Sequence, residues 1–225
     1  MTTESISDDA LQAEVKAWLS ENWSEEVAKT FGVDGYMSAS KERQQWLAKV
    51  VDAGWAVPRW STEWFGRNLN NDQAKIIERE FAKVRAPGTG QDRTNLWANT
   101  LLAQGQDALK EKLVGPLLRG EVNMCLLYSE PGAGSDLAGI RTRADLDGDH
   151  YIVNGQKVWT SGAATADYGM LIARTNWDVP KHQGISFFFL PMKQKGIEVR
   201  PLRQITNERH FNEVFITDAV VPAEN

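Results

Sequence analysis

The densest group of residues that could do chemistry is a glycine-containing loop behind an apolar run. It reads Leu126-Leu127-Tyr128-Ser129-Glu130-Pro131-Gly132-Ala133-Gly134-Ser135-Asp136. Glycine lets another group approach the main chain closely, so such a loop can cradle a phosphate or the polar edge of a planar ring. It lacks the Gly-Lys-Ser/Thr ending of a P-loop, and no helical run follows it as in a dinucleotide fold. On its pattern alone, a structural turn is the simpler interpretation.

Cysteine and histidine offer little further chemistry. Cys125 lies within an apolar run, so we predict a small buried hydrophobe and not a reactive thiol. A single cysteine also excludes a disulfide within the chain. The histidines His150, His182 and His210 share no close spacing with each other or with Cys125, which disfavours a zinc site.

The first part of the chain has the apolar periodicity of helices. Leu11, Val15, Trp18 and Leu19 recur at helical spacing, and Ser7 suits the start of that helix. The region 54–70 contains proline and glycine, which predicts an ordered loop and not a strand. Further helices are predicted over residues 41–53, stopping at Gly54; from about residue 71, with Ile77, Phe81 and Val84 on one stripe and an end before Pro87; and on either side of Gly105, with Pro116 breaking the pattern.

From about residue 123 the pattern changes to short β-type runs separated by turns. Tyr151-Ile152-Val153 precedes Asn154-Gly155, a dipeptide that strongly predicts a hairpin turn. Residues 168–173, 185–190 and 214–217 are predicted to be further strands. We therefore predict an α+β protein, with an all-helical domain over residues 1–120 and a β-sandwich or barrel domain over residues 121–225.

Composition excludes several classes of protein. The 225 residues carry a formal net charge of −5, and 42% of them are hydrophobic, as in soluble globular proteins. An acidic chain without a basic block is poorly suited to binding nucleic acid through its phosphates. The first residues lack the features of a signal peptide, and no apolar run is long enough for a membrane span. We predict a soluble cytoplasmic protein.

Several further motifs give the glycine loop a context. Downstream come Asn154-Gly155-Gln156-Lys157-Val158-Trp159-Thr160-Ser161-Gly162, Phe211-Asn212-Glu213-Val214-Phe215 and Val220-Val221-Pro222-Ala223-Glu224-Asn225, and upstream come Ala53-Gly54-Trp55-Ala56-Val57-Pro58 and Leu117-Leu118-Arg119-Gly120-Glu121. In this order and at these spacings, over nearly the whole chain, the motifs resemble the acyl-CoA dehydrogenase family. The resemblance implies a helical domain, a middle β domain and a C-terminal four-helix domain, with residue 225 lying where the third domain would begin.

The resemblance also implies roles for individual residues. Leu126, Tyr128 and Ser129 match a stretch along the flavin of FAD, although the family often has threonine where Ser129 stands. Gly134 and Ser135 match the end of the glycine loop, with Ser135 also at the entrance for acyl-CoA. The second flavin segment matches Trp159, Thr160 and Ser161. Taken alone, Trp159 would be interpreted as a core aromatic residue.

By the same resemblance the reaction is α,β-dehydrogenation of an acyl-CoA to a trans-2-enoyl-CoA. A glutamate removes the α-proton, the β-hydrogen leaves as hydride to the flavin, and an electron-transferring flavoprotein accepts the electrons. The glutamate is expected in the C-terminal domain, so no catalytic base is predicted among residues 1–225, and Glu130, His210 and Glu213 are not assigned that role. Glu130 is expected to fix the loop by hydrogen bonds. The protein is expected to form a homo- or hetero-oligomer.

Three other interpretations share these motifs. A flavin monooxygenase or oxidase would use the same segments but react with oxygen. A partner subunit of a heteromeric dehydrogenase would lack the base. An inactive fragment would serve at most as a β-domain scaffold. The acyl chain itself, fatty or steroid-derived, is not specified by these residues.

Overall fold

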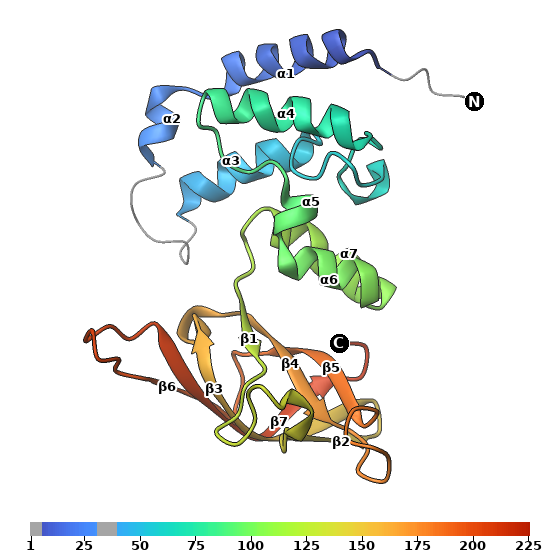
Figure 1. Ribbon diagram of the computed structural model, residues 1–225, viewed down its shortest axis with the longest axis vertical. Helices are drawn as coiled ribbons and strands as arrows, with labels where there is room; N and C mark the ends of the chain where they lie inside the picture. Colours follow the sequence, from blue (N-terminus) through green and yellow to red (C-terminus); the bar gives the residue numbers. More distant parts are fainter. Residues whose placement is uncertain (1–5, 31–39) are drawn as a thin grey trace. The chain divides into compact units, whose positions relative to one another are not determined.

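A computed structural model describes residues 6–30 and 40–225. The chain forms two compact units, Met1–Glu121 and Val122–Asn225. The first is helical and the second is built from strands, which confirms the predicted α+β class (Figure 1).

The helical unit is made of short and medium helices joined by ordered turns. Their bounds are α1 Asp8–Asn22, α2 Glu25–Thr30, α3 Lys41–Asp52, α4 Asn71–Lys83, α5 Gln91–Thr94, α6 Leu96–Gln104 and α7 Asp107–Leu118, with a 3-10 turn, η1, at Thr62–Trp64.

Capping and apolar stripes explain where the longer helices begin and what they bury. The Ser7 side chain accepts a hydrogen bond from the Ala10 N–H at the start of α1, as predicted. Leu11 and Val15 of α1 are fully buried, and α1 packs alongside α4 (Figure 1). The Trp18 and Trp46 rings lie 5.5 Å apart between centroids, which joins α1 to α3 within one aromatic core.

Two predictions for the helical unit are wrong. Val84 lies just beyond α4 and is 45% exposed, so it does not extend the buried stripe. Pro116 lies inside α7 and does not end it. A proline removes one backbone donor, and this loss falls in the last turn, where the Arg119 N–H still closes the helix by donating to Gly115 O at 3.0 Å.

The segment between α3 and α4 is an ordered loop, as predicted. The Gly66 N–H donates to Ser61 O at 2.9 Å, and the Leu69 N–H donates to Pro58 O at 3.0 Å. A Cβ atom at Gly66 would lie 2.0 Å from Trp60 O, so this close approach of two backbone segments requires glycine.

The second unit is one curled sheet around an apolar core. Its strands are β1 Met124–Leu127, β2 Arg143–Asp147, β3 His150–Ser161, β4 Tyr168–Arg174, β5 Ile185–Pro191, β6 Ile197–Pro201 and β7 Phe211–Pro222, with 3-10 turns η2 Leu137–Gly139 and η3 Ala163–Thr165. The strand order is β1-β4-β2-β3-β7-β6, and β5 pairs with the other edge of β4 (Figure 1). Buried residues of β1, β4, β5 and β7 fill the core, among them Leu127, Leu171, Leu190 and Val214.

The predicted hairpin turn at Asn154-Gly155 is wrong. Both residues lie inside β3, and the turn between β2 and β3 contains Gly148, at φ +63°. Gly155 serves a different purpose, because a Cβ there would lie 2.7 Å from the Thr142 Cα and 2.3 Å from its Oγ1. Asn154 pairs with Asp218 of β7 through two hydrogen bonds, beside a register shift in the β3–β7 pairing.

Candidate functional site

The two segments singled out from the sequence lie side by side in the β unit. Leu126 ends β1 with its neighbour Leu127, Tyr128 and Ser129 continue the chain, and Trp159 to Ser161 form the end of β3. The Val158 N–H donates to Ser129 O at 2.8 Å. This hydrogen bond joins the loop to the strand directly, so the fold brings together residues about 30 positions apart in the sequence.

The side chains of these segments divide into an exposed and a buried set. Leu126 is 36% exposed and Trp159 is 60% exposed, which are high values for large apolar side chains. The predicted residues Gly134, Ser135 and Ser161 are also exposed, and Tyr128 and Ser129 are half-buried. Thr160 is buried, and its Oγ1 has no hydrogen-bond partner among the described residues. The Thr160 carbonyl accepts from the Asn212 amide at 2.9 Å, so Thr160 lies behind the exposed surface and not on it.

An irregularity in β3 turns Trp159 out of the sheet. Lys157 pairs with Val214 of β7 and Thr160 with Asn212, so three steps along β3 match two along β7. Trp159 lies within this bulge at φ +60°, a left-handed conformation that costs a residue with a Cβ roughly 1–2 kcal/mol. Its ring contacts Phe211 edge to face, with centroids 5.9 Å apart. The exposed indole excludes the core-aromatic interpretation.

A buried ion pair lies directly behind the exposed residues. Lys157 has no exposed surface, and its Nζ lies 2.8 Å from the Glu130 Oε1. The same Nζ donates to Tyr128 O at 3.1 Å and to Ile172 O at 2.8 Å. Glu130 also accepts from the backbone N–H groups of Arg141 at 2.7 Å and Thr142 at 2.9 Å. Glu130 thus fixes the loop by hydrogen bonds, as predicted.

Burial and hydrogen bonding have opposite effects on the pKa of each side chain of this pair. Burial disfavours the Glu130 carboxylate, but its hydrogen bonds from Lys157, Thr142 and Arg141 outweigh burial, and its pKa lies below the ordinary value. Burial lowers the pKa of Lys157, and the neighbouring Glu130 carboxylate opposes that shift. Beside their mutual contact, the two side chains make four hydrogen bonds to the main chain, and such partners are what a buried ion pair requires.

The far end of the glycine loop is fastened to the segment between β4 and β5. Asp136 accepts from Lys181 Nζ at 2.7 and 2.8 Å, and this contact lowers the Asp136 pKa. The Arg174 guanidinium, 5% exposed, donates to Ala138 O at 2.6 Å and to Lys181 O at 3.1 Å. A Cβ placed on Gly134 would meet nothing within 4 Å. The outer side of the turn is therefore open to a ligand.

The three titratable side chains considered as a base, Glu130, Glu213 and His210, are each engaged with a neighbouring group. Glu130 is buried in its ion pair, and Glu213 accepts from the Gln156 amide at 3.1 Å. His210 lies 3.3 Å from Glu208 on the exposed loop before β7. Burial raises the pKa of Cys125 to about 12, which leaves it an unreactive thiol, as predicted. Among the described residues, no group of three or more histidine, cysteine or acidic side chains is arranged to hold a metal ion.

Lys157 was not predicted as a site residue, although the sequence carries a signal for it. Val153, Gly155 and Lys157 alternate along β3, and the alternation places Lys157 on the same inward face as the buried Val153. A lysine at an inward strand position needs a buried partner. Glu130, the one acidic residue inside the loop before Asp136, was the available candidate.

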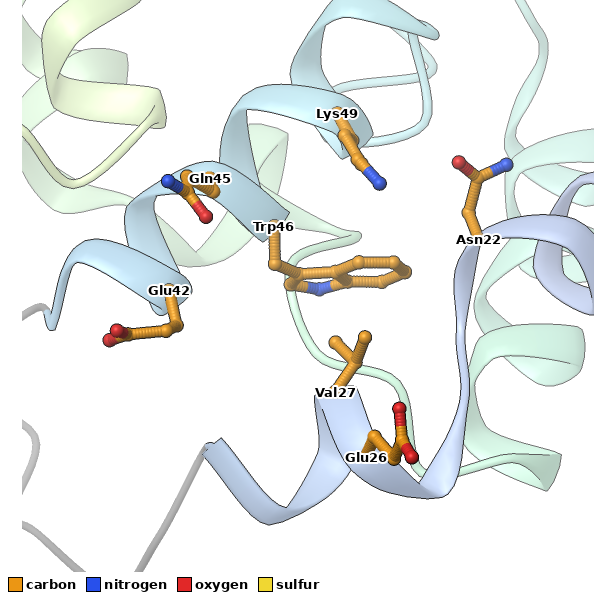
Figure 2. A pocket seen from close by; sticks show the side chains of 7 residues that line it. All are labelled: Asn22, Glu26, Val27, Glu42, Gln45, Trp46 and Lys49. Atoms are coloured by element: carbon orange, nitrogen blue, oxygen red, sulfur yellow. The ribbon is translucent and has the colours of Figure 1, made fainter.

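A separate hollow lies in the helical unit. Figure 2 shows it between the end of α1, α2 and α3, with the Trp46 ring at its base. It has a volume of about 260 Å³. The Glu42 carboxylate at its rim is hydrogen-bonded to the backbone N–H of Glu42 itself and to the Ser40 side chain, which lowers its pKa. Such a helix-start carboxylate is a structural feature. The hollow is lined by Asn22, Glu26, Val27, Glu42, Gln45, Trp46 and Lys49.

Comparison with known proteins identifies the family. Residues 6–121 match the model of the acyl-CoA dehydrogenase N-terminal domain, and residues 125–219 match that of the acyl-CoA dehydrogenase middle domain. The helical unit thus corresponds to the N-terminal domain of one known class of oxidoreductase. The curled β unit, with its joined segments at the ends of β1 and β3, corresponds to the middle domain of the same class. The chain belongs to the acyl-CoA dehydrogenase family.

Individual relatives agree with this assignment. The chain is 36% identical over 225 aligned residues to acyl-CoA dehydrogenase IpdE1 of Mycobacterium tuberculosis, covering 96% of the chain and 57% of that protein. It is 41% identical over 192 residues to acyl-CoA dehydrogenase FadE34 of the same organism, covering 84% of the chain and 26% of that protein. The chain thus spans little more than half the length of the first relative and about a quarter of the second.

Two solved structures share this fold. The ChsE4-ChsE5 complex from Mycobacterium tuberculosis matches with a TM-score of 0.68 at 29% identity, over 100% of this chain and 56% of that one. The "Tcur3481-Tcur3483 steroid ACAD" matches with a TM-score of 0.69 at 27% identity, over 99% of this chain and 57% of that one. No helix in the described part of the chain is long and apolar enough to cross a membrane.

Proposed function

We propose that the protein containing this chain catalyses FAD-dependent α,β-dehydrogenation of an acyl-CoA thioester to the trans-2-enoyl-CoA. One observation carries the proposal: the Ser129–Val158 hydrogen bond joins a glycine loop to a strand end that exposes an indole. Family membership supplies the reaction class. The joined segments supply a surface suited to the cofactor.

The residues fit the cofactor that the family implies. The exposed faces of Trp159 and Leu126 suit a planar ring system. The exposed hydroxyl of Ser161 and the half-buried hydroxyl of Ser129 offer hydrogen bonds to a ring edge. The open turn at Gly134 and Ser135 leaves room for phosphate groups and for the acyl-CoA. These residues would hold FAD and the entrance to the substrate site.

This chain contributes binding, orientation and exclusion of water. FAD, when bound, accepts the hydride equivalent that the acyl chain loses. The exposed residues of the two joined segments would orient the flavin ring, and the apolar side chains of Trp159 and Leu126 would keep water from one side of it. The α-proton needs a base within hydrogen-bond reach. Glu130 and Glu213 are already engaged within the β unit, so we propose that the base lies outside residues 1–225. An electron-transferring flavoprotein is the proposed electron acceptor.

The second candidate is a subunit of a two-chain dehydrogenase. It is favoured by the similarity to the ChsE4-ChsE5 complex and to the "Tcur3481-Tcur3483 steroid ACAD". We propose that this chain's protein assembles with a related dehydrogenase chain and acts on steroid-derived acyl-CoA. In that arrangement the base can be provided by either chain.

The test uses the full-length protein purified alone and together with any co-purifying dehydrogenase chain. Anaerobic mixing with fatty and steroid-derived acyl-CoA should bleach the flavin absorbance and yield enoyl-CoA. Bleaching only in the two-chain preparation supports the second candidate. Rapid reoxidation of the reduced flavin by air would favour an oxidase or monooxygenase. Protein that shows no flavin absorbance after FAD is added would refute the proposal.

A further inference from the structure

The position of Lys157 coincides with a gap in the sheet. β4 pairs with β1 over Tyr168–Leu171 and with β2 only at Arg174, so Ile172 falls between the two partners. At this gap the chain leaves the sheet as the loop between β1 and β2. Lys157, which belongs to β3, extends its Nζ into the gap and donates to Ile172 O at 2.8 Å. The ammonium group therefore replaces a missing strand-to-strand hydrogen bond.

One ammonium group connects three separate parts of the unit. Its donors reach Ile172 O in β4, Tyr128 O at the start of the loop, and the Glu130 carboxylate. An ammonium has three donors, and all three are used. Glu130 continues the connection, because its two oxygens accept from the N–H groups of Arg141 and Thr142 at the end of the same loop. The pair thus closes the loop at its base.

The same pair is linked to both segments of the candidate site. Val158 follows Lys157 and donates to Ser129 O, and Trp159 follows Val158 at the bulge. The glycine turn with Gly134 and Ser135 lies inside the loop that Glu130 closes. A shift of Lys157 would therefore move the loop and the strand end relative to each other.

Stability alone does not account for a charged pair at this place. Well-packed apolar side chains in the same volume often give equal or greater stability than a buried ion pair. What apolar side chains cannot supply is a fixed geometry between three backbone segments. Hydrogen bonds to Tyr128 O, Ile172 O and Glu130 do fix it, because each is directional.

We propose that Lys157 and Glu130 form a positioning pair that holds the loop segment 126–135 and the strand end 159–161 at the separation the cofactor requires. The proposal rests on the proposed function, since it assigns the purpose of the pair to FAD binding. The pair does not touch the reacting atoms. It acts through the exposed residues that it supports.

The test compares Lys157→Met with a control of similar destabilisation elsewhere in the same core. Val221→Ala is suitable because Val221 is fully buried in β7 and pairs with Tyr151, at the opposite end of β3 from Trp159. Hydrogen exchange by mass spectrometry is measured on the polypeptide of residues 1–225 without cofactor. FAD affinity is then measured by quenching of flavin fluorescence.

Lys157→Met should raise exchange at least tenfold in peptides covering 126–136 and 158–162, with little change at 186–190 in β5. FAD affinity should fall at least tenfold. Val221→Ala should raise exchange around the start of β3 and the end of β7, and should change FAD affinity less than twofold. Should Lys157→Met not fold, Glu130→Gln keeps the two carbonyl contacts of Lys157, and the same two segments should loosen.

The outcomes separate this proposal from the proposed function. Selective loosening without FAD binding by the unaltered polypeptide would refute the cofactor assignment and leave the mechanical linkage intact. The positioning pair would be overturned if Lys157→Met and Val221→Ala weakened FAD binding equally, or if hydrogen exchange rose uniformly across the unit. Either result leaves the other conclusion standing.

Discussion

Replacing Trp159 by glycine separates its structural cost from its contact with the cofactor. With 60% of the residue exposed, only about 100 Å² of the indole is covered, worth at most about 2.5 kcal/mol at ~25 cal/mol per Å². Glycine at φ +60° also avoids a left-handed strain of roughly 1–2 kcal/mol. The greater conformational freedom of glycine in the unfolded chain lowers the folding stability again by about 0.4–1 kcal/mol. The net loss of stability should be about 1–2 kcal/mol.

Trp159→Ala provides the matched comparison. Alanine loses the same contact with Phe211 but keeps the strain, so the glycine variant should be at least as stable as the alanine variant. That order is the reverse of the one in ordinary strand positions, where glycine is weaker. Urea unfolding of both variants measures the difference. An alanine variant more stable by about 1 kcal/mol would refute the strained bulge.

Cofactor binding should respond differently from stability. Loss of a stacked aromatic surface typically costs about 1–3 kcal/mol of binding, so both variants should bind FAD about 5- to 150-fold more weakly. Because the two variants lack the same ring, their affinities should agree within a small factor even where their stabilities differ. Affinities within twofold of the unaltered polypeptide would show that the indole does not contact the flavin.

Four further predictions follow from the same geometry. Gly155→Ala should lower unfolding stability by about 1–3 kcal/mol in urea melts, because its Cβ would overlap Thr142. The pKa of Glu130 lies below its ordinary value of 4.5, so the ionised carboxylate stabilises the fold above pH 4.5, and this stabilisation should be lost as pH falls through the lowered pKa. Melting temperatures measured against pH should show this loss in the unaltered polypeptide and not in Glu130→Gln. Ser161→Ala should weaken FAD binding by about 1 kcal/mol in fluorescence titrations with unchanged melting, because Ser161 is exposed. The polypeptide of residues 1–225 with FAD and a dye acceptor should show no acyl-CoA turnover above free flavin; turnover would direct attention to Glu130 and Glu213.

The sequence predicted the fold correctly where local propensity and tertiary contacts favour the same structure. Ser7 caps α1 and Gly54 follows α3 at φ +76°, as propensity alone indicates. The failures occur where distant contacts decide. Asn154-Gly155 has the chemistry of a turn, but the close approach of Thr142 and the pairing with Asp218 hold it inside β3. Pro116 is tolerated because the end of a helix loses little by it.

The motifs of the candidate site were predicted from the sequence, but the buried contacts of Lys157 that support them were not. The exposed residues on both segments were singled out from the resemblance, and their role in binding FAD stays a prediction. The buried side that supports them was overlooked, because a lysine in a strand is usually an exposed residue. The bulge that exposes Trp159 depends on the pairing register of β3 with β7. That register is not visible without the partner strand.

Mapping where FAD binds shows whether the loop and the strand end form one FAD-binding surface. The measurement is an amide NMR spectrum of the polypeptide of residues 1–225, recorded during a titration with FAD. We expect saturable shifts concentrated at residues 126–135 and 158–162, with weaker effects in the rest of the β unit. Shifts confined to the hollow between α1, α2 and α3 (Figure 2), or no shifts at either segment, would contradict it.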